Sequence, residues 1–471
     1  MRKWILFAVA LTAFPAHLFA VTTYSLPLPP QANTYVDRYQ GITQSKQNSV
    51  AKLIVPPTTL QEAVNFKAHN LDVVNYINTH FMQPAEFSLS TIHTLADFKL
   101  AVFSQSADFA QANFLKGADF TWADFNGNAA FSYADFKGPA SFYSVKFLKP
   151  VSFFSAEFSG DANFQFTDYH GTANFAQNIF LGNMNFHKSL FHDATTFQLT
   201  QFGKFADFEF TMFLGLTNFT RAKFLDEVNF SHAEFLGRAL FYEVTLPRYM
   251  NFSDAEIKKT IDLTTALPNT TNARTDINLL HTDISKIKLR YSMFKLYFPP
   301  NTSTSDISFT YQALMSSLKN NGFEDDYYLA ATEFAEYQYL SAHHPILNFI
   351  DKYWWNYGFD KPRIFLWILV ILFVLTFINA LFYEWLMLHA FEVTFLQTLA
   401  ANRVTQKNCV VRYVHYLPFS LLYTVYIFFG GLIGFKRDAD KFKSKNYFVN
   451  LYLIFIIVIG LMCTFFVLKN L

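Results

Sequence analysis

The sequence predicts a β-solenoid, followed by a helical segment and membrane-spanning helices. Large apolar residues recur at alternating steps of five and six from Phe87 to Leu263, and internal repetition of this kind indicates a solenoid. A small residue, usually Ala, stands two positions before most of them. Near the C-terminus, two stretches of about twenty apolar residues are each long enough to cross a bilayer.

The repeat has a period of eleven residues, and one Phe in each period defines an axis that we predict to be buried. The predicted axis consists of Phe98, Phe109, Phe120, Phe131, Phe142, Phe153, Phe164, Phe175, Phe186, Phe197, Phe208, Phe219, Phe230 and Phe241. A period of eleven also fits a right-handed coiled coil. However, a small and a large residue two positions apart share a face only in an extended chain. The spacing therefore favours strands over helices.

Asp or Asn stands immediately before most of the Phe residues that open a five-residue step, as in Asp97, Asp108 and Asn174. These side chains hydrogen-bond to the backbone two residues further on and so favour turns. If four steps make one coil, a coil takes about 22 residues and rises about 4.8 Å. Roughly eight such coils would form a rod on the order of 40 Å long.

The repeated triplets resemble the Ala-(Asp/Asn)-Leu-x-x pattern of pentapeptide-repeat proteins. Matching segments are Ala96-Asp97-Phe98, Ala107-Asp108-Phe109 and Ala162-Asn163-Phe164. The resemblance implies a right-handed, four-sided β-helix. This chain departs from the family pattern because Phe replaces the central Leu and every second step has a sixth residue.

Residues 1–20 resemble an export signal, with Arg2 and Lys3 before an apolar core and Ala20 as the expected cleavage point. The alternative is an uncleaved membrane anchor. Either form would place the next segment outside the cytoplasm. Residues 21–58 are rich in Pro and are expected to form a linker.

Residues 59–81 are predicted to form a helix that caps the first coil. Its apolar residues would cover the open end of the solenoid, as a terminal cap must. These apolar residues are Leu60, Val64, Leu71, Val74 and Ile77. The repeat proper is then expected over residues 82–263.

Beyond the repeat, the pattern weakens. Residues 264–300 are expected to form a frayed final coil that ends at Pro299 and Pro300. Residues 301–362 are expected to hold a pair of helices and a juxtamembrane segment. The break between the two helices is predicted at Asn320-Asn321-Gly322, since this sequence favours a turn.

The last third of the chain is predicted to be a membrane domain. We expect transmembrane helices at 363–385 and 447–468, with a basic loop or interfacial helix at 386–415. Residues 416–435 are either a third span or a re-entrant hairpin. Positively charged loops prefer the cytoplasm, so a repeat domain on the non-cytoplasmic side favours two spans and a hairpin. The expected location is the inner (cell) membrane.

Four stretches of the C-terminal part also match a known arrangement: Tyr311 to Tyr327, Tyr357-Gly358, Pro362-Arg363 and the apolar segment Phe419 to Gly434. They resemble the tail of some bacterial pentapeptide-repeat proteins, in which a two-span module is similar to a tetrameric cation-channel pore. The resemblance implies self-association through the membrane domain and a cytoplasmic repeat. The expected pore loop would contain Phe429, Gly430, Gly431 and Gly434. The potassium-filter sequence Thr-Val-Gly-Tyr-Gly does not occur here.

The sequence offers little catalytic chemistry. It has no nucleophile elbow, phosphate loop or zinc-ligand spacing. His192-Asp193 resembles half of a metal or acid–base site, but no partner is visible nearby in the sequence, so we expect solvated turn residues. Cys409 and Cys463 cannot form a disulfide framework. We therefore expect no enzyme activity, no cofactor and no metal.

Three hypotheses for function follow. The leading one is a membrane-anchored scaffold whose rod binds a protein partner that the sequence does not identify. The second is a channel-like protein with a degenerate filter. The third is a nucleic-acid mimic, which requires a strongly acidic rod. Residues 87–263 carry 18 acidic and 13 basic side chains, and the net charge of the chain is +1, so no nucleic-acid partner is expected.

Overall fold

The computed structural model describes residues 58–269, 274–383, 386, 409–430 and 447–470. Several segments discussed above lie outside these residues. They are the expected signal or anchor at 1–20, the linker up to residue 57, nearly all of the basic loop before residue 409, and Gly431 and Gly434 of the expected pore loop.

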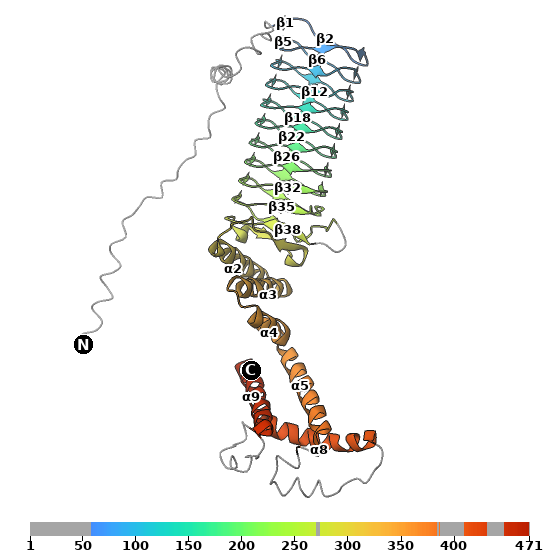
Figure 1. Ribbon diagram of the computed structural model, residues 1–471. Helices are drawn as coiled ribbons and strands as arrows, with labels where there is room; N and C mark the ends of the chain where they lie inside the picture. Colours follow the sequence, from blue (N-terminus) through green and yellow to red (C-terminus); the bar gives the residue numbers. More distant parts are fainter. Residues whose placement is uncertain (1–57, 270–273, 384–385, 387–408, 431–446, 471) are drawn as a thin grey trace, which may run out of the picture. The chain divides into compact units, whose positions relative to one another are not determined.

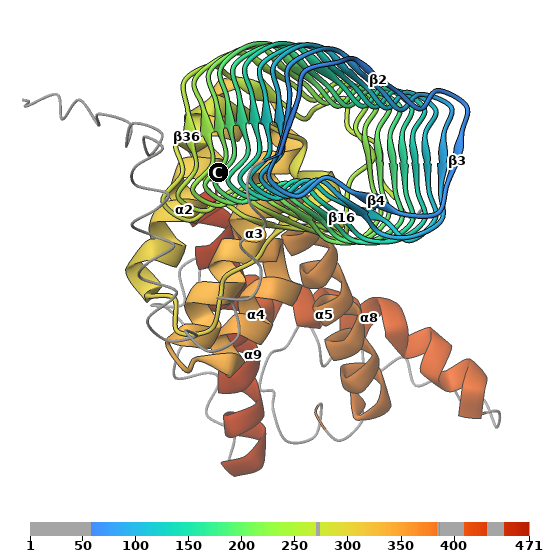
Figure 2. The same cartoon turned by 90° about the horizontal axis from the view of Figure 1, so that it is seen from above.

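Residues 58–296 form a β-solenoid with four walls, each a parallel sheet of very short strands (Figures 1 and 2). Sheet I contains β1 (Thr58–Leu60), β5 (Thr79–Phe81), β9 (Val102–Phe103), β13 (Asp124–Phe125), β17 (Lys146–Phe147), β21 (Asp168–Tyr169), β25 (Leu190–Phe191), β29 (Met212–Phe213), β33 (Glu234–Phe235) and β36 (Glu256–Ile257). Sheet II contains β2 (Val64–Asn65), β6 (Ala85–Glu86), β10 (Ala107–Asp108), β14 (Ala129–Ala130), β18 (Val151–Ser152), β22 (Ala173–Asn174), β26 (Thr195–Thr196), β30 (Thr217–Asn218) and β34 (Ala239–Leu240).

The other two walls complete each coil. Sheet III contains β3 (Asn70–Leu71), β7 (Thr91–Ile92), β11 (Asn113–Phe114), β15 (Asp135–Phe136), β19 (Glu157–Phe158), β23 (Ile179–Phe180), β27 (Gln201–Phe202) and β31 (Lys223–Phe224). Sheet IV contains β4 (Val74–Asn75), β8 (Ala96–Asp97), β12 (Ala118–Asp119), β16 (Ala140–Ser141), β20 (Ala162–Asn163), β24 (Met184–Asn185), β28 (Ala206–Asp207), β32 (Glu227–Asn229), β35 (Tyr249–Asn251), β38 (Thr275–Asn278) and β40 (Phe294–Leu296). A further pair joins β37 (Ile261–Asp262) to β39 (Ile287–Lys288).

Within the repeat, strands pair with the equivalent strand 22 residues further on, as in Ala107 with Ala129 and Phe114 with Phe136. Backbone hydrogen bonds therefore run between coils; for example, the N–H of Phe109 donates to the carbonyl of Ala130 at 2.7 Å. Because each wall is hydrogen-bonded along its length, only the two ends of the solenoid expose unpaired strand edges. The predicted coil of about 22 residues is confirmed.

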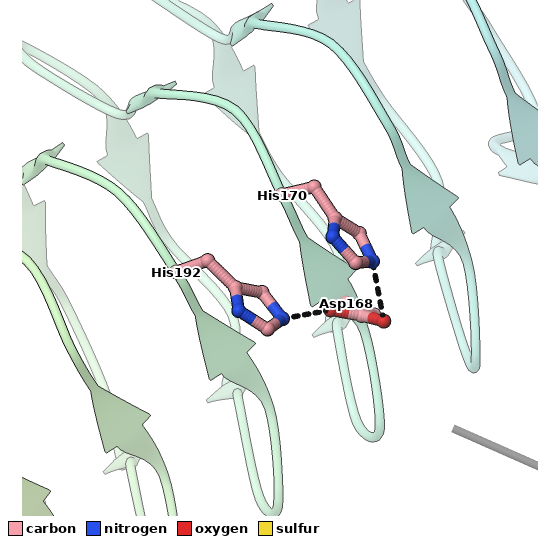
Figure 3. A group of neighbouring side chains, drawn as sticks. All are labelled: Asp168, His170 and His192. Atoms are coloured by element: carbon pink, nitrogen blue, oxygen red, sulfur yellow. Dashed lines mark hydrogen bonds and ion pairs between the residues drawn. The ribbon is translucent and has the colours of Figure 1, made fainter. Parts of the chain in front are cut away.

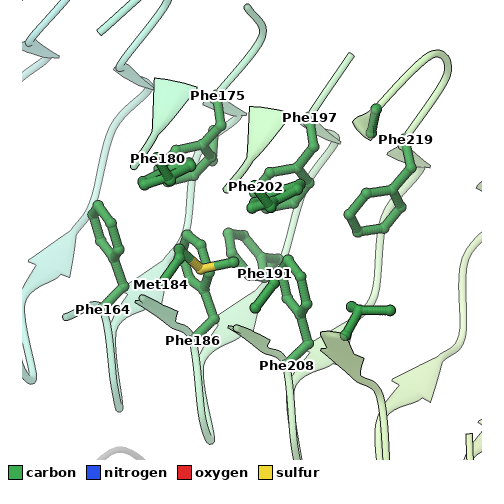
Figure 4. Packing of buried hydrophobic residues seen from close by; sticks show 14 of the residues in the cluster. Phe164, Phe175, Phe180, Met184, Phe186, Phe191, Phe197, Phe202, Phe208 and Phe219 are labelled. Carbon is green, nitrogen blue, oxygen red and sulfur yellow. The ribbon is translucent and has the colours of Figure 1, made fainter. Parts of the chain in front are cut away.

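The core of the solenoid is a set of stacked Phe columns (Figure 4). The ring of Phe186 lies parallel to those of Phe164 and Phe208 on the neighbouring coils, at centroid distances of 4.7 and 5.5 Å. Phe175 meets it edge-on at 5.2 Å. Offset and edge-on pairs are the favourable aromatic geometries. All fourteen predicted axis residues are 0–1% exposed, so the predicted buried axis is confirmed.

The corners use the predicted Asp and Asn turns. The Oδ1 atom of Asp97 accepts the N–H of Lys99 at 3.2 Å, and that of Asn174 accepts the N–H of Ala176 at 2.9 Å. The residue after the N–H donor of this turn takes a left-handed backbone. Leu100, which follows Lys99, has φ 58°. L-residues adopt this conformation at a cost of about 1–2 kcal/mol. A left-handed residue recurs every eleven residues over most of the length of the solenoid.

The prediction of a capping helix at 59–81 is wrong. This stretch forms the first coil, with strands β1 to β4, and the first strand of the second coil, β5. Val64 and Leu71 pair with Ala85 and Ile92 of the second coil. The Oδ1 atom of Asn65 accepts the N–H of Lys67 at 3.1 Å, as at the other corners. Hydrogen bonds to the next coil outweigh a local helical pattern, because tertiary context overrides weak helix propensity.

The C-terminal end of the solenoid carries the helical cap. The region expected as a frayed coil forms β38 and β40, with two 3₁₀ turns, η1 (Ile284–Lys286) and η2 (Tyr291–Met293). The predicted helical pair is α2 (Thr304–Asn320) and α3 (Glu324–Ser341). Leu314 and Leu318 of α2 and Phe334 of α3 belong to the same buried cluster as the Phe columns. The pair therefore closes the last coil.

The remaining helices are α4 (Pro345–Trp355), the turn η3 (Asn356–Gly358), α5 (Lys361–Leu381), α8 (Cys409–Gly430) and α9 (Tyr447–Asn470). Two helices of the described chain are long and apolar enough to cross a membrane, at Pro362–Leu381 and Tyr447–Phe465. The apolar part of α8, Tyr416–Phe429, is shorter. Its fourteen residues extend about 21 Å. That is less than the roughly 30 Å of a bilayer core.

Candidate interaction surface and histidine cluster

One corner of the solenoid, between sheets IV and I, carries a line of aromatic side chains. We call it the aromatic corner; it consists of Trp122, Tyr143, Phe166, His187, Phe210 and His232. These residues directly follow axis Phe residues on successive coils, at the first or second position of the turn. They lie in the turn that follows the axis residue, where the chain leaves the strand, so they face outward while the axis residues face the core.

Consecutive members of the aromatic corner are in contact. Tyr143 meets Phe166 edge-on at a centroid distance of 5.4 Å, and Phe210 stacks on His232 at 4.4 Å. The ammonium of Lys188 lies 5.8 Å from the ring centre of Phe166 and 5.4 Å from that of Phe210. Phe166 and Phe210 remain 39% and 44% exposed. Trp122, Tyr143 and His187 are partly buried. Aromatic side chains are enriched at protein–protein interfaces, so the aromatic corner is a candidate interaction surface.

The opposite corner, between sheets II and III, is mixed. Gln111, Gln177, Arg221 and Glu243 are polar, whereas Tyr133 meets Phe154 edge-on at 5.5 Å. Arg221 and Glu243 form an ion pair at 2.7 Å between adjacent coils. The two corners share the same backbone, so the difference between them lies in the side chains that they present.

A second cluster lies where sheet I leads into the next corner (Figure 3). It includes His192, which was considered above as half of a metal or acid–base site. Its partners are Asp168 and His170. The Nε2 atom of His170 lies 3.0 Å from Oδ2 of Asp168, and that of His192 lies 3.0 Å from Oδ1. The two imidazole rings stack at 4.4 Å. Asp193, the expected other half of the site, instead accepts the N–H of Ala194.

Sequence reasoning missed these partners because it looked for them nearby in the chain. The usable signal was the spacing: His170 and His192 are 22 residues apart, which is one coil. The same spacing brings His187 beside Glu209, with Nδ1 and Oε2 3.3 Å apart. Asp207 completes this second group. Residues one coil apart are neighbours in any solenoid.

Only two of the four expected pore-loop residues lie within the described part of the chain. Phe429 and Gly430 end the helix α8 and belong to no loop. Phe429 packs against the apolar cluster that joins α5, α8 and α9. The segment from Phe419 to Gly430 is continuous helix, so it contains no hairpin reversal. A run of apolar residues without a turn signal before Gly430 favours this helix.

Comparison with known proteins supports the repeat assignment. A family model described as pentapeptide repeats (9 copies) matches residues 77–121, 98–146 and 131–177. No curated protein and no solved structure matches the chain. The resemblance noted in the sequence is thus confirmed for this part of the solenoid, and the strand pairing extends the same fold to residue 296.

Proposed function

Because the chain carries a pentapeptide-repeat β-solenoid and two long apolar helices, we propose that it is a membrane-anchored scaffold. The solenoid would present its aromatic corner to a protein partner. The observation that carries this proposal is the outward apolar surface of α5 and α9, on which Leu369, Phe373 and Phe465 are 64%, 70% and 64% exposed. Such a surface is costly in water and favourable in lipid.

The interior of the helical domain also fits a bilayer. Asn379 of α5 is 1% exposed. It donates from Nδ2 to the hydroxyl of Thr424 in α8 at 2.8 Å and accepts from the hydroxyl of Tyr452 in α9 at 2.8 Å. Buried polar side chains that pair across helices are a recurrent contact in membrane proteins. The link supports an arrangement in which polar groups face inward and apolar groups face lipid.

Close backbone approach supports the same conclusion. A Cβ atom at Gly460 of α9 would lie 1.9 Å from the carbonyl oxygen of Phe428 in α8. Only Gly permits this approach, and small residues at helix contacts are a common feature of membrane bundles.

The regular structure of the solenoid also supports the proposed scaffold function. Aromatic residues are enriched at protein–protein interfaces, and the aromatic corner spans several coils. A surface ordered before binding loses little conformational entropy when a partner docks. The proposal therefore assigns no reaction to this chain.

We further propose that the solenoid lies on the non-cytoplasmic side of the inner membrane. The export-signal pattern at residues 1–20 and the basic residues around Lys436 and Arg437 support this orientation. A cytoplasmic solenoid would instead fit the channel-like hypothesis.

The test is protease accessibility of the full chain in cells stripped of any outer barrier. Cleavage between residues 21 and 58 before lysis is the expected result, with the C-terminal part retained in the membrane after alkaline carbonate washing. Protection until lysis would overturn the proposed orientation. Release of the chain by carbonate would overturn the proposed anchor.

The binding surface is tested separately by site-specific photocrosslinking in the same membranes. A benzophenone amino acid at position 210 of the aromatic corner should give a discrete protein adduct. The matched control places it at position 199, an exposed Leu with the same left-handed backbone. Equal adducts at both positions, or none at either, would contradict the assignment of the aromatic corner as the binding surface.

A further inference from the structure

We propose that Asp168, His170 and His192 form a binding site for a divalent transition-metal ion of the zinc type. One ligand atom from each residue lies within 4.8 Å of the other two. Imidazole nitrogen and carboxylate oxygen are common protein ligands of Zn²⁺. The cluster lies on the side of the solenoid, far along the sequence from the helical domain, and the scaffold function does not require it.

The geometry suits a metal with tetrahedral ligands. Each Nε2 atom lies 3.0 Å from an Asp168 oxygen. A tetrahedral ion with bonds of about 2.0–2.1 Å holds its ligand atoms about 3.3 Å apart. The two Nε2 atoms contact different oxygens of Asp168, and the three ligand atoms lie within 4.8 Å of one another. The side chains must therefore move by up to about 1.5 Å to bind one ion. Without a metal, the same atoms make hydrogen bonds, as Figure 3 shows.

The fourth coordination position would be open to solvent. The side chains of Asp168, His170 and His192 are 16%, 33% and 30% exposed. Three protein ligands and one water are typical of accessible zinc sites, whereas structural sites are closed by four protein ligands. The proposed site is therefore one that exchanges its metal with the medium or shares it with a partner.

The backbone holds the two histidines in register. The N–H of His170 donates to the carbonyl of Phe147 at 2.8 Å, and the N–H of His192 donates to that of Tyr169 at 2.9 Å. Both bonds belong to the stack of coils, which places the imidazoles one above the other. A preorganised ligand set loses little entropy on binding. Without a metal, Nε2 of each ring donates its proton to a carboxylate oxygen of Asp168. To bind a metal through Nε2, each neutral ring must instead carry its proton on Nδ1.

The second group of potential ligands is a weaker candidate and provides a control. The Oδ1 atom of Asp207 already accepts the N–H of Glu209 at 3.0 Å and Nδ2 of Asn229 at 3.2 Å. Burial raises the pKa of the Asp207 carboxyl, which disfavours the anion that a metal requires. The imidazole of His187 is partly exposed, at 22%, somewhat less than those of His170 and His192.

The test uses the full chain, purified in detergent and freed of metal with a chelator. Isothermal titration calorimetry should show that each chain binds about one equivalent of Zn²⁺, as expected for a single site with three protein ligands. His170→Ala and His192→Ala should each weaken zinc binding by at least about tenfold. Loss of a residue that merely hydrogen-bonds to a metal ligand already has an effect of this size. His187→Ala should bind as the wild type does. Cobalt substitution should give the intense visible absorption of a tetrahedral site, and it should disappear in both variants.

Folding of each variant is checked by circular dichroism and by its melting temperature in chelator. Because the rings are partly exposed, we expect these to match the wild type, so that a loss of binding reports on the site. Zinc uptake that is unchanged in His170→Ala and His192→Ala would overturn the proposal. So would uptake that falls equally in His187→Ala, or a wild-type chain that takes up no zinc; the cluster would then be a hydrogen-bonded stack only.

Discussion

Asp326, at the start of α3, forms an ion pair with Arg290 of the last coil, with Oδ2 2.5 Å from Nε. The other carboxylate oxygen accepts the backbone N–H of Ser292 at 2.7 Å. The side chain of Asp326 is 1% exposed, whereas that of Arg290 is 44% exposed. One buried carboxylate thus joins the helical cap to the solenoid through two charge-assisted hydrogen bonds.

Replacing Asp326 by Ala should loosen this cap. The backbone N–H of Ser292 would lose its acceptor, and we expect the C-terminal part of the solenoid to lose about 2 kcal/mol of stability. Native-state hydrogen exchange of the last coil measures this. The control is Asp325→Ala, which alters an exposed neighbour in the same helical turn. Equal exchange in both variants would show that the ion pair does not hold the cap.

The cap should also open in alkali. Burial raises the pKa of Tyr311 to about 12, with a smaller contribution from Glu333, and burial raises that of Tyr291 above its usual range. A raised pKa means that the folded state favours the protonated phenol. This stability is fully present below about pH 10, the ordinary tyrosine value. It is lost as the pH rises through about 12, by roughly 2–3 kcal/mol for Tyr311.

The measurement is the melting temperature of the cap between pH 9 and about pH 12. Tyr311→Phe should reduce this dependence, because it removes one of the two phenols whose pKa is raised. Tyr328→Phe, at an exposed position of α3, should leave it unchanged. A profile that is the same in Tyr311→Phe and in the wild type would contradict the prediction.

An axial Phe should be indispensable to the stack. Phe175 is 0% exposed, so Phe175→Asp would bury an unpaired charge and leave a cavity. We expect a loss of more than about 3 kcal/mol, seen as a lower melting temperature. Lys188→Glu changes an exposed corner residue and removes only the contacts with Phe166 and Phe210. Its cost should be about 0.5–1 kcal/mol. Melts of both variants that match the wild type would be inconsistent with the stacked core.

The left-handed corners make a prediction about backbone strain. Gln111 is exposed and has φ 57°. Gln111→Gly should be neutral or stabilise the chain by up to about 1 kcal/mol, because relief of strain exceeds the entropy that Gly adds to the unfolded state. Gln111→Val should destabilise it by about 1 kcal/mol or more, since a β-branched residue resists this conformation. Thermal melts that rank Val above Gly would contradict the strain argument.

The polar link of the helical domain is also testable. Asn379→Leu removes the hydrogen bonds to Thr424 and Tyr452. Such bonds contribute about 0.6–2 kcal/mol in membrane proteins, and we expect a loss of this size in denaturation assays in detergent. Thr464→Ala is the control, because its hydroxyl donates to the carbonyl of Gly460 within one helix. A larger loss in Thr464→Ala than in Asn379→Leu would refute the link between helices.

The solenoid was predictable because its determinants are local and periodic. The buried axis, the Asp and Asn turns and the coil length all follow from spacings along the chain, and Phe186 and Asp97 behave as their positions require. The break between α2 and α3 at Asn321 and Gly322 follows from turn chemistry in the same way. The burial of Asp326 was not predicted, because it depends on the contact of α3 with the last coil.

The sequence by itself determined that this chain forms a Phe-lined solenoid and that it carries two stretches apolar enough to cross a membrane. The tertiary structure decided the rest. It made residues 59–81 strands of the first two coils, because the next coil supplies backbone partners that a helix would leave unused. It placed His192 beside Asp168 and His170, because stacking coils turns a separation of 22 residues into contact. Contacts between coils depend on register, and register exists only once the chain has folded.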